Sequence, residues 1–271
     1  MSHEKTENIG LIAGGGQFPL MAADAAKKKG FNIIAVAHIG ETDSILAEKV
    51  DEIIWIKLGQ LGRLIKSLKK FGVCKALMAG SIKKRRMFEG IKPDLTGAAV
   101  ISRLAIFHDD NILKAVDRAL AKEGIEVISS ASFLSELFVA PGCLTKRKPS
   151  RSEKEDIKFG WDMAKELGRL DIGQCIVVRK KTVLAIEAIE GTDETIRRGG
   201  ELAKEKAVVI KLCKPNQDLR FDLPTIGLET LKTMSLVKAS VLAVEAGKTL
   251  VFDREEMVKY ADNAGISIIS I

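Results

Sequence analysis

Short apolar runs alternate with helical stretches through the first half of the chain, and this order constrains the fold more than any other feature. Amphipathic stretches typical of helices lie at residues 18–30, 60–72 and 109–124, between apolar runs at 9–16, 31–40, 51–58, 74–80 and 125–132. Strands that alternate with helices build a parallel sheet with helices on both faces. We therefore expect an α/β protein whose residues 1–140 form an N-terminal, Rossmann-like domain that binds a nucleotide or phosphate.

The rhythm changes after residue 140. Residues 141–152 are rich in proline, serine and charge, which is typical of a linker. Beyond them the pattern predicts helices over 153–170, 191–206 and 228–239, a strand over 207–214 and another over 266–271, and hairpins that turn at 180–181 and 246–248. Two hairpins combined with helices indicate a mixed sheet. Residues 153–271 are therefore expected to form a C-terminal domain of a different α/β type.

The composition narrows the class of protein. With 46% hydrophobic residues in 271, the chain can bury a sizeable core. No apolar run is long enough to cross a bilayer, and the N-terminus lacks a basic segment followed by an apolar one, so we expect a cytoplasmic protein. The four cysteines form no CxxC pair, and Cys74, Cys175 and Cys213 lie in apolar runs, which predicts buried, reduced thiols and disfavours a zinc site.

The net charge of +7 points to an anionic partner. Aromatic residues make up only 5% of the chain, and no stretch interleaves them with lysine or arginine. Stacking on nucleic-acid bases therefore has little support, and we expect no nucleic-acid partner. Phosphorylated substrates or an anionic membrane surface fit the charge better. The basic segments 83–86 and 145–158 are either solvated loops or loops that face a ligand.

Two loops rich in small residues follow the first and fourth apolar runs. In GLIAGGGQFP, Gly14, Gly15 and Gly16 precede a helix start, where backbone N–H groups favour an anion. This is not the GxGxxG of dinucleotide-binding proteins, so an NAD site is weakly supported, and a simple tight turn is the other interpretation. In MAGSIKKRR, Gly80 precedes a basic run. In a parallel sheet both loops lie at one edge, where basic side chains suit a pyrophosphate.

The stretch AIEAIEGTD places three carboxylates around a glycine. Glu187, Glu190 and Asp193 lie close together in the sequence, at the passage from an expected strand to an expected helix. One interpretation is structural, with Thr192 or Asp193 capping the helix and an acid on the solvent face. The other is functional, because several carboxylates can supply the oxygen ligands that a hard cation prefers.

The stretch DLRFDLPTIG alternates like an extended chain, with Asp218, Arg220 and Asp222 on one face. In an ideal strand the two aspartates are about 13 Å apart, which is too far for both to bind one metal ion. Either the chain bends to bring them closer, or one binds metal while the other fixes Arg220. A solvated edge strand with a surface ion pair is the structural alternative.

Taken together, the sequence blocks resemble the LpxI family of UDP-2,3-diacylglucosamine pyrophosphatases over nearly the whole chain. The blocks that carry the resemblance are GLIAGGGQFP, MAGSIKKRR, HDDNILKAV, DIGQCIVVRKKTVLAIEAIEGTD and KPNQDLRFDLPTIG. The resemblance implies a hydrolase of lipid A biosynthesis that depends on magnesium, with manganese as an alternative metal. Water attacks the α-phosphorus of UDP-2,3-diacylglucosamine, and the products are UMP and 2,3-diacylglucosamine 1-phosphate (lipid X).

The resemblance also implies site residues and partners. It implies that residues 153–271 are the catalytic domain and that an aspartate of the RFDLP block is needed for turnover, which by motif match is Asp222, with Asp218 second. The expected partners are the lipid-linked nucleotide sugar, which is the substrate, and the surface of the inner membrane, to which the protein would bind peripherally. The sequence is also compatible with a homo-oligomer. The implied catalytic residues are Asp222, Asp218 and Arg220, the metal ligands Asp222, Asp193 and Glu190, and the substrate-binding residues Ala13, Gly14, Gly15, Gly16, Gly80, Lys83, Lys84, Asp110, Thr145, Gln174, Gly191 and Thr192.

The residues also allow two other functions. A nucleotide-sugar-binding module without catalysis would use the same glycine loop and treat the carboxylates as structural; it would release no UMP from substrate and magnesium. An NAD-dependent oxidoreductase rests only on the strand, glycine loop and helix start, and the absence of GxGxxG makes it the weakest reading.

Overall fold

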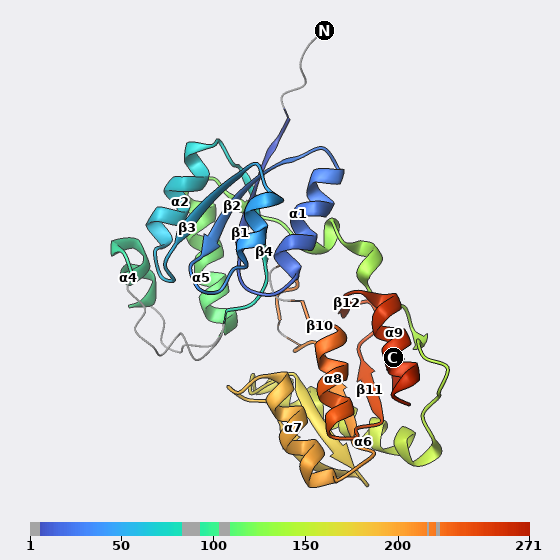
Figure 1. Cartoon of the computed structure of the whole chain (residues 1–271). Helices are drawn as coiled ribbons and strands as arrows, with labels where there is room; N and C mark the ends of the chain where they lie inside the picture. Colours follow the sequence, from blue (N-terminus) through green and yellow to red (C-terminus); the bar gives the residue numbers. More distant parts are fainter. Residues whose placement is uncertain (1–5, 83–92, 103–108, 216, 221–222) are drawn as a thin grey trace. The chain divides into compact units, whose positions relative to one another are not determined.

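The computed structural model describes residues 6–82, 93–102, 109–215, 217–220 and 223–271. The chain divides into two units: residues 1–135 with 218–222 form the N-terminal unit, and residues 136–217 with 223–271 form the C-terminal unit. Each unit holds a β-sheet with helices packed on it (Figure 1), which confirms the expected α/β class. In the part of the chain that is described, no helix is long and apolar enough to span a membrane.

The N-terminal unit is built on a parallel sheet with the strand order β3-β2-β1-β4-β5. The strands are β1 (Asn8–Ala13), β2 (Asn32–His38), β3 (Glu52–Ile56), β4 (Lys75–Ala79) and β5 (Glu126–Val127). The helices are α1 (Phe18–Lys28), α2 (Leu61–Lys70), α4 (Leu95–Ile101) and α5 (Asp109–Lys122), with 3-10 turns η1 (Ser44–Glu48) and η2 (Ser130–Ser132). The fifth strand is shorter than expected, because the chain turns through η2 soon after Val127.

Alternate residues of these strands are buried on opposite faces of the sheet. Ile12, Val36 and Met78 join residues of α2 and α5 in one apolar cluster. Leu11 and Ile33 alternate with them and are fully buried on the other face, where α1 lies (Figure 1). Burial on both faces explains why the strands are continuous apolar runs. Helices thus cover both faces of the sheet, and ligands of such α/β sheets bind at the carboxyl ends of the strands.

The C-terminal unit is built on a mixed sheet with the strand order β6-β13-β11-β9-β7-β8. Its strands are β6 (Gly142–Cys143), β7 (Cys175–Arg179), β8 (Thr182–Ile186), β9 (Val208–Lys211), β11 (Val241–Val244) and β13 (Ser267–Ser270). The helices are α6 (Arg151–Arg169), α7 (Thr192–Ala203), α8 (Leu228–Leu236) and α9 (Arg254–Asn263). A separate pair joins β10 (Thr225–Ile226) to β12 (Leu250–Val251), and a 3-10 turn, η3 (Ser135–Leu137), precedes the sheet.

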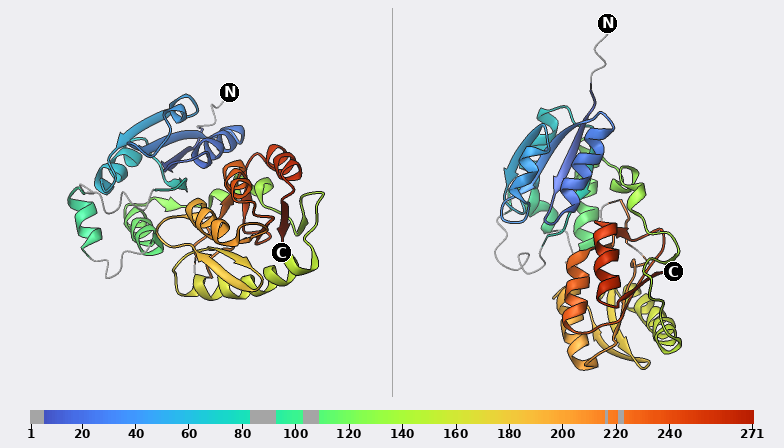
Figure 2. Two further views of the ribbon diagram at one scale, coloured as in Figure 1. Left: turned by 60° about the horizontal axis from the view of Figure 1, so that its bottom comes forward. Right: turned by 45° about the vertical axis from the view of Figure 1, so that its right-hand side comes forward.

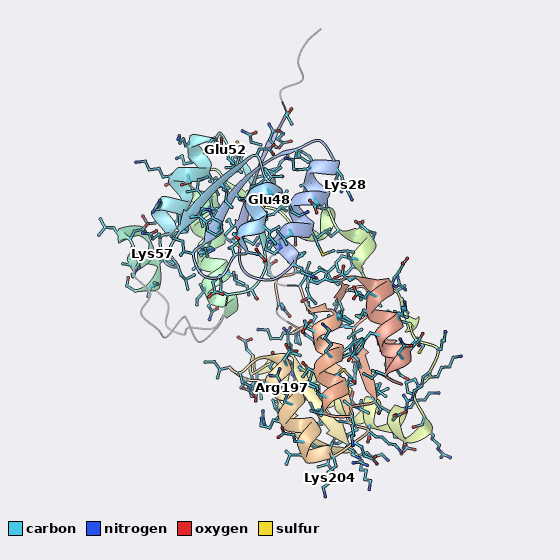
Figure 3. All side chains as sticks on the ribbon, in the orientation of Figure 1. Lys28, Glu48, Glu52, Lys57, Arg197 and Lys204 are labelled. Carbon is cyan, nitrogen blue, oxygen red and sulfur yellow. The ribbon has the colours of Figure 1, made fainter. Side chains whose placement is uncertain are left out.

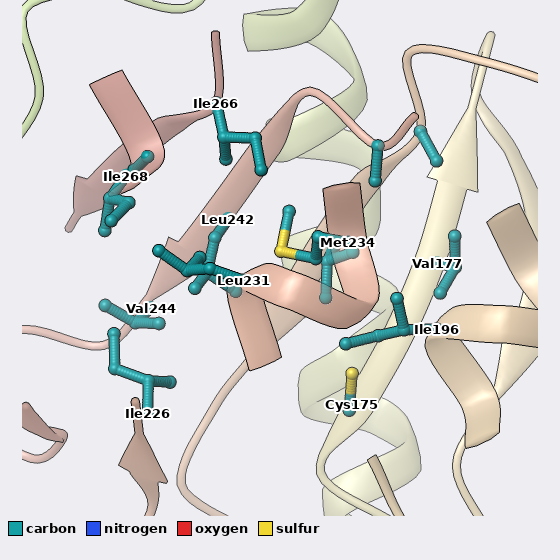
Figure 4. Packing of buried hydrophobic residues seen from close by; sticks show 14 of the residues in the cluster. Cys175, Val177, Ile196, Ile226, Leu231, Met234, Leu242, Val244, Ile266 and Ile268 are labelled. Carbon is teal, nitrogen blue, oxygen red and sulfur yellow. The ribbon is translucent and has the colours of Figure 1, made fainter. Parts of the chain in front are cut away.

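Helices cover both faces of this sheet too. Side chains of α7, α8 and α9 pack on one face, where Cys175, Val177 and Leu242 meet Ile196 and Met234 in a single cluster (Figure 4). The long helix α6 packs on the opposite face, as the two views of Figure 2 show. The sheet is therefore the middle layer of three, and its side chains are sorted between two cores by strand alternation.

Of the two expected hairpins, the first is present, and the prediction of the second is wrong. The turn at Lys180 and Lys181 joins antiparallel β7 and β8, with positive φ angles of 50° and 56°. The turn at 246–248 joins no hairpin, because β11 pairs in parallel with β9 and β13, while β12 pairs in parallel with β10. The apolar run of β11, buried throughout, is typical of a central parallel strand.

Two smaller expectations also needed correction. Residues 218–224 were expected to be extended, yet Leu219 and Arg220 lie in a turn. The thiols of Cys175 and Cys213 are buried as expected, whereas Cys74 is exposed, because it lies before the amino end of β4. In both cases the local apolar pattern extends beyond the ends of the regular elements, so it does not report the structure of these residues.

The stretch expected to be a linker is held firmly by the C-terminal unit. β6 pairs antiparallel with β13, and the Arg147 guanidinium donates to both carboxylate oxygens of Glu153, at 2.6 and 2.8 Å. Glu153 also closes a capping box with Ser150 at the start of α6 and accepts a hydrogen bond from Ser240. Both contacts come from Nη2 of Arg147, and charge-assisted hydrogen bonds of this kind are stronger than those between neutral groups. Residues 142–153 are therefore part of this unit's structure.

The contact between α7 and β7 depends on a glycine and gives a stability prediction. A Cβ on Gly199 would lie 2.5 Å from the Cβ of Val177, an atom fixed to the strand backbone. We expect Gly199→Ala to lower the free energy of unfolding by about 2 kcal/mol, because the overpacking outweighs the better helix propensity of alanine. Urea unfolding of both proteins measures this, with the exposed Glu201→Ala of the same helix as control. Unchanged stability of Gly199→Ala would contradict the packing.

Candidate functional site

The two loops rich in small residues meet at the carboxyl edge of the N-terminal sheet, as expected for parallel strands. The Gly14 N–H donates to the carbonyl of Ala79 at 2.8 Å, and the Gly15 N–H donates to the carbonyl of Ser81 at 2.7 Å. A Cβ on Gly80 would lie 2.6 Å from the Gly15 carbonyl oxygen. Close approach of the two loops therefore requires glycine at these positions, and two of the loop's N–H groups are occupied within the protein.

Gly16 and Ala13 have different surroundings. Gly16 has a φ of 86°, and nothing lies within 4 Å of the place where its Cβ would be, so this end of the loop is open. The Ala13 carbonyl, by contrast, is fixed by the hydroxyl of Thr42 at 2.7 Å and by Nδ1 of His38 at 2.9 Å. Burial lowers the pKa of His38, which keeps the ring neutral at neutral pH. The end of β1 is thereby held rigidly beside the open glycine.

Arg220 joins the segment 218–220 to the same unit. Its Nε lies 3.1 and 3.2 Å from the two carboxylate oxygens of Asp218, and its Nη2 lies 2.8 Å from one of them. The same Nη2 lies 2.9 Å from Oδ2 of Asp117 in α5, and Nη1 lies 3.4 Å from the carbonyl of Val127 in β5. A guanidinium with a rigid fork of donors can bridge several acceptors in this way. Asp218 thus holds Arg220 in place, a contact that fits both the functional alternative, in which one aspartate fixes Arg220, and the structural alternative of an ion pair.

The charges of this network stabilise each other. The hydrogen bonds from Arg220 lower the pKa of Asp218, and the nearby charge of Lys114 lowers it further. The pKa of Arg220 is raised by Asp218 first and then by Asp117. Both groups are therefore charged at neutral pH. The Arg220 side chain remains 41% exposed near the carboxyl end of β5, while two carboxylates hold its position.

Several predicted residues of this unit lie outside the described residues, namely Lys83, Lys84 and Asp222. Asp110 lies in α5, but its side chain is also outside the described part. The roles that the resemblance implies for these residues stay predictions. Asp222 follows Arg220 by two residues, so the anchored guanidinium fixes the chain directly before the predicted catalytic aspartate.

A second group of polar residues lies at an edge of the C-terminal sheet. Glu187 follows β8 directly, its backbone N–H donates to the Cys175 carbonyl at 2.8 Å, and its side chain is only 8% exposed. The hydroxyl of Thr192, at the start of α7, donates to Oε1 of Glu187 at 3.1 Å. The N-cap of α7 is Gly191, with a φ of 86° and no side-chain cap, so the expected cap by Thr192 or Asp193 is wrong. Thr192 is turned to Glu187 instead.

Lys211, at the end of β9, completes this group. Its side chain is 7% exposed, and its Nζ donates to the carbonyl of Thr225 at 2.9 Å. Cys175 of β7 is the strand partner of Lys211 and lies next to Glu187 on its other side. Burial raises the pKa of the Cys175 thiol strongly, and the charge of Glu187 adds to this while Lys211 opposes it. Cys175 is therefore an inert, protonated thiol between a buried acid and a buried base.

The predicted metal ligands differ in how they are engaged. Glu190 forms an ion pair with Arg198 at 2.6 Å; burial acts to raise its pKa, but this pairing and backbone hydrogen bonds lower it overall. Asp193 lies in the first turn of α7, without a hydrogen bond or ion pair to the residues that are described. Across those residues, no group of three or more His, Cys, Asp or Glu side chains could hold a metal ion. Magnesium can however bind through one or two carboxylates and substrate phosphates.

The remaining predicted ligands are placed apart from one another. Gln174 precedes β7, and its side-chain oxygen is buried with no hydrogen-bond partner in the described structure. Thr145 lies near the start of β13, where its hydroxyl donates to the Arg147 carbonyl and accepts from the Ile268 N–H. The strand start is the opposite edge from Glu187 and Lys211, so the structure does not bring Thr145 together with them. A role of Thr145 in substrate binding stays a prediction.

Sequence reasoning missed Asp117 and Lys211. Asp117 sat within a well-patterned helix, where an acid normally faces solvent, and nothing in the sequence showed that residue 220 would return to it. Lys211 interrupts the apolar run AVVIKLCK, and a charge inside such a run was a signal that could have been used. Glu187 is among the acids of AIEAIEGTD, but its spacing in the sequence does not distinguish it from Glu190 and Asp193.

Comparisons with known proteins fit this arrangement. Residues 8–137 match the model of the LpxI N-terminal domain and residues 140–269 that of the LpxI C-terminal domain. The chain is 32% identical over 276 aligned positions to the UDP-2,3-diacylglucosamine pyrophosphatase LpxI of Caulobacter vibrioides, with 97% of each chain covered.

Solved structures of other proteins resemble the chain only distantly. The N5-carboxyaminoimidazole ribonucleotide synthetase of Thermotoga maritima is 18% identical with a TM-score of 0.23, and the match covers 69% of this chain and 43% of that one. The protein gox2253 is 10% identical with a TM-score of 0.30, at 91% and 78% coverage. Likenesses at this level support no conclusion about fold or function. The two domain matches and the curated relative do, and they show that the chain belongs to the LpxI family, an enzyme family, as its sequence blocks indicated.

Proposed function

We propose that the protein hydrolyses the pyrophosphate bond of UDP-2,3-diacylglucosamine in lipid A biosynthesis and releases UMP and 2,3-diacylglucosamine 1-phosphate. The observation that carries the proposal is the match to the curated pyrophosphatase, which extends over 97% of both chains and therefore includes both units. A non-catalytic nucleotide-sugar-binding module has no comparable support.

The chemistry needs positive charge on the phosphoryl oxygens and an oriented water molecule. Arg220 supplies such a charge, because Asp117 and Asp218 orient its guanidinium while part of it stays exposed. In the proposed reaction, water attacks the α-phosphorus and the bond from this phosphorus to the bridging oxygen breaks. The leaving group is 2,3-diacylglucosamine 1-phosphate, and UMP keeps the oxygen of the attacking water. A carboxylate that accepts the proton of the attacking water fits the predicted role of Asp222.

The direct test of this reaction uses phosphorus NMR of products formed in oxygen-18 water. The proposal expects UMP that carries the new oxygen, seen as an isotope shift of its phosphorus signal, and 2,3-diacylglucosamine 1-phosphate without it. Label in the lipid product instead would show attack on the other phosphorus. Absence of both products from pure protein with substrate and magnesium would leave only a binding function.

We further propose that magnesium assists the reaction, with Asp222, Asp193 and Glu190 as the predicted ligands. Asp193 fits this best among the described residues, because its carboxylate has no partner there, whereas Glu190 is engaged by Arg198. When bound, magnesium would neutralise phosphate charge. We expect removal of divalent cations with EDTA to reduce UMP release at least 100-fold, and magnesium, or less well manganese, to restore it. Full activity in EDTA would refute the metal requirement.

Peripheral binding to the inner membrane is also proposed, since the substrate has two acyl chains. Exposed basic side chains, among them Lys28, Lys57, Arg197 and Lys204, occur in both units (Figure 3). Anionic lipid attracts such residues with about 1 kcal/mol each near the surface. We expect the protein to float with phosphatidylglycerol vesicles at low salt and to dissociate at high salt. Equal flotation with purely zwitterionic vesicles, or none with either, would contradict an electrostatic attachment.

A further inference from the structure

Glu187 and Lys211 lie on the same face of the C-terminal sheet and at the same edge. Cys175 of β7 is the direct strand partner of Lys211, and the Glu187 N–H bonds to the Cys175 carbonyl from the other side. Directly opposed residues of neighbouring strands point to the same face. The backbones of Glu187 and Lys211 are therefore two strand spacings apart, roughly 10 Å. Their side chains lie on the face where α7 packs, and Thr192 in the first turn of α7 donates to Glu187.

Both charged groups are buried, and both are incompletely satisfied by the described residues. Oε1 of Glu187 accepts from Thr192, but Oε2 is buried without a hydrogen-bond partner. The Nζ of Lys211 donates to the Thr225 carbonyl, which uses one of its three hydrogens. No ion pair joins Glu187 to Lys211 in the described structure, so each charge lacks a full set of partners. Buried charges are normally paired, and a buried polar atom without a partner destabilises a fold.

The chemistry of the two groups defines a ligand that would satisfy them. The unpartnered carboxylate oxygen needs a hydrogen-bond donor, such as a hydroxyl or an amide N–H. The ammonium needs an acceptor, and a phosphate oxygen is the strongest of the common ones. A ligand with both features a few ångströms apart is a phosphorylated sugar. The unreactive Cys175 between them would contribute only van der Waals contacts.

We propose that Glu187 and Lys211 are substrate-binding residues that hold a sugar phosphate, with a sugar hydroxyl or amide donating to Glu187 and the phosphate accepting from Lys211. The proposal rests on the proposed function for its choice of substrate. A donor group beside a phosphate occurs twice in that substrate. One instance is the glucosamine 1-phosphate portion, and the other is the ribose 5′-phosphate of UMP. The experiment distinguishes these two sources.

The test measures binding and turnover separately with the full chain. Glucosamine 1-phosphate and UMP are each titrated by calorimetry or by NMR line shifts onto the wild type, Glu187→Gln and Lys211→Met. We expect wild type to bind at least one of them, and each variant to weaken that binding about 10- to 100-fold, as for loss of a hydrogen bond to a charged group. The KM for UDP-2,3-diacylglucosamine should rise by a similar factor, with a smaller change in kcat. Glu194→Gln and Lys232→Met, exposed members of surface ion pairs, serve as matched controls.

The thermal midpoints separate a ligand role from a structural one. Because Glu187 carries an unpartnered buried oxygen, Glu187→Gln should melt no lower than the control Glu194→Gln, while losing the stabilisation that saturating ligand gives. If Lys211→Met does not fold, Lys211→Arg, which keeps the charge but changes the head-group shape, should weaken ligand binding in its place. Variants that melt lower but bind normally would overturn the proposal, as would wild type that binds neither fragment. A Glu187→Gln variant that shifts only the magnesium requirement would also overturn it.

Failure of this inference and failure of the proposed function give different results. If wild type releases UMP and the variants keep a normal KM, the pyrophosphatase function stands and the two residues have no part in it. If wild type binds glucosamine 1-phosphate through Glu187 and Lys211 but releases no UMP, the binding site stands and the proposed reaction does not.

Discussion

Asp222→Asn is expected to reduce UMP release about 1,000-fold while the protein stays folded and still binds substrate. The reason is that the resemblance to the LpxI family implies a catalytic aspartate, predicted at this position, and a carboxylate that acts as general base contributes roughly 100- to 10,000-fold to a rate. Asparagine keeps the size of the side chain but neither accepts the proton of the attacking water nor carries negative charge toward a cation. Release of UMP is measured from radiolabelled or chromatographically resolved substrate at saturating magnesium.

Asp162→Asn is the matched control, because Asp162 is an exposed aspartate of α6. The control should keep wild-type kcat, and both variants should melt near the wild-type temperature. A rate within a factor of a few of wild type in Asp222→Asn would remove this residue from the chemistry. The role would then pass to Asp218, which the same block offers as second choice, and Asp218→Asn would be the next variant to measure.

Arg220→Lys is expected to lower kcat about 100-fold, and Asp117→Asn about 10-fold. The guanidinium meets Asp218 through Nε and Nη2, Asp117 through Nη2 and the Val127 carbonyl through Nη1. A lysine ammonium is a single point of charge and cannot reproduce this fork. The segment before Asp222 would then be held less precisely, and a displacement of about 1 Å at a reacting group costs on the order of 100-fold in rate.

The distribution of the effect between kcat and KM tests this explanation. If Arg220 positions the segment, Asp117→Asn lowers kcat with little change in KM, although Asp117 need not touch the substrate. If Arg220 acts only by attracting phosphate, KM rises in Arg220→Lys and Asp117→Asn is nearly silent. Glu123→Gln is the control and should keep wild-type values. Glu123 directly follows α5 and forms an exposed ion pair with Lys69.

The sequence predicted the N-terminal sheet well because both physical signals agreed there. Each strand such as FNIIAVAHIG is an apolar run, and each helix such as QLGRLIKSLKKFG is amphipathic, so pattern and propensity gave one answer. The meeting of the Gly14 and Gly80 loops followed from parallel pairing alone. The second hairpin failed because a glycine turn between two apolar runs has the same local appearance whether the strands pair with each other or with distant partners.

The site was harder to predict, because its contacts join positions remote in the sequence. Asp117 and Arg220 are 103 residues apart, and neither residue's neighbours carry any sign of the other. Lys211 and Glu187 become neighbours of Cys175 only through the strand order β9-β7-β8. The strand order and register that decide which polar residues share an edge are set by the whole core, whereas residue type and spacing report only on the local chain.

The assignment of residues 218–222 to the N-terminal unit bears on how the chain acquires its structure during synthesis. The ribosome delivers residues 1–135 first, but the arginine that neutralises Asp117 emerges only after the whole of 136–217 has been made. Until then Asp117 of α5 lacks the ion pair that Arg220 makes with it. A fragment that ends near residue 140 would never form the Arg220–Asp117 ion pair. The first unit is therefore completed only by a segment that is synthesised later, between two parts of the second unit.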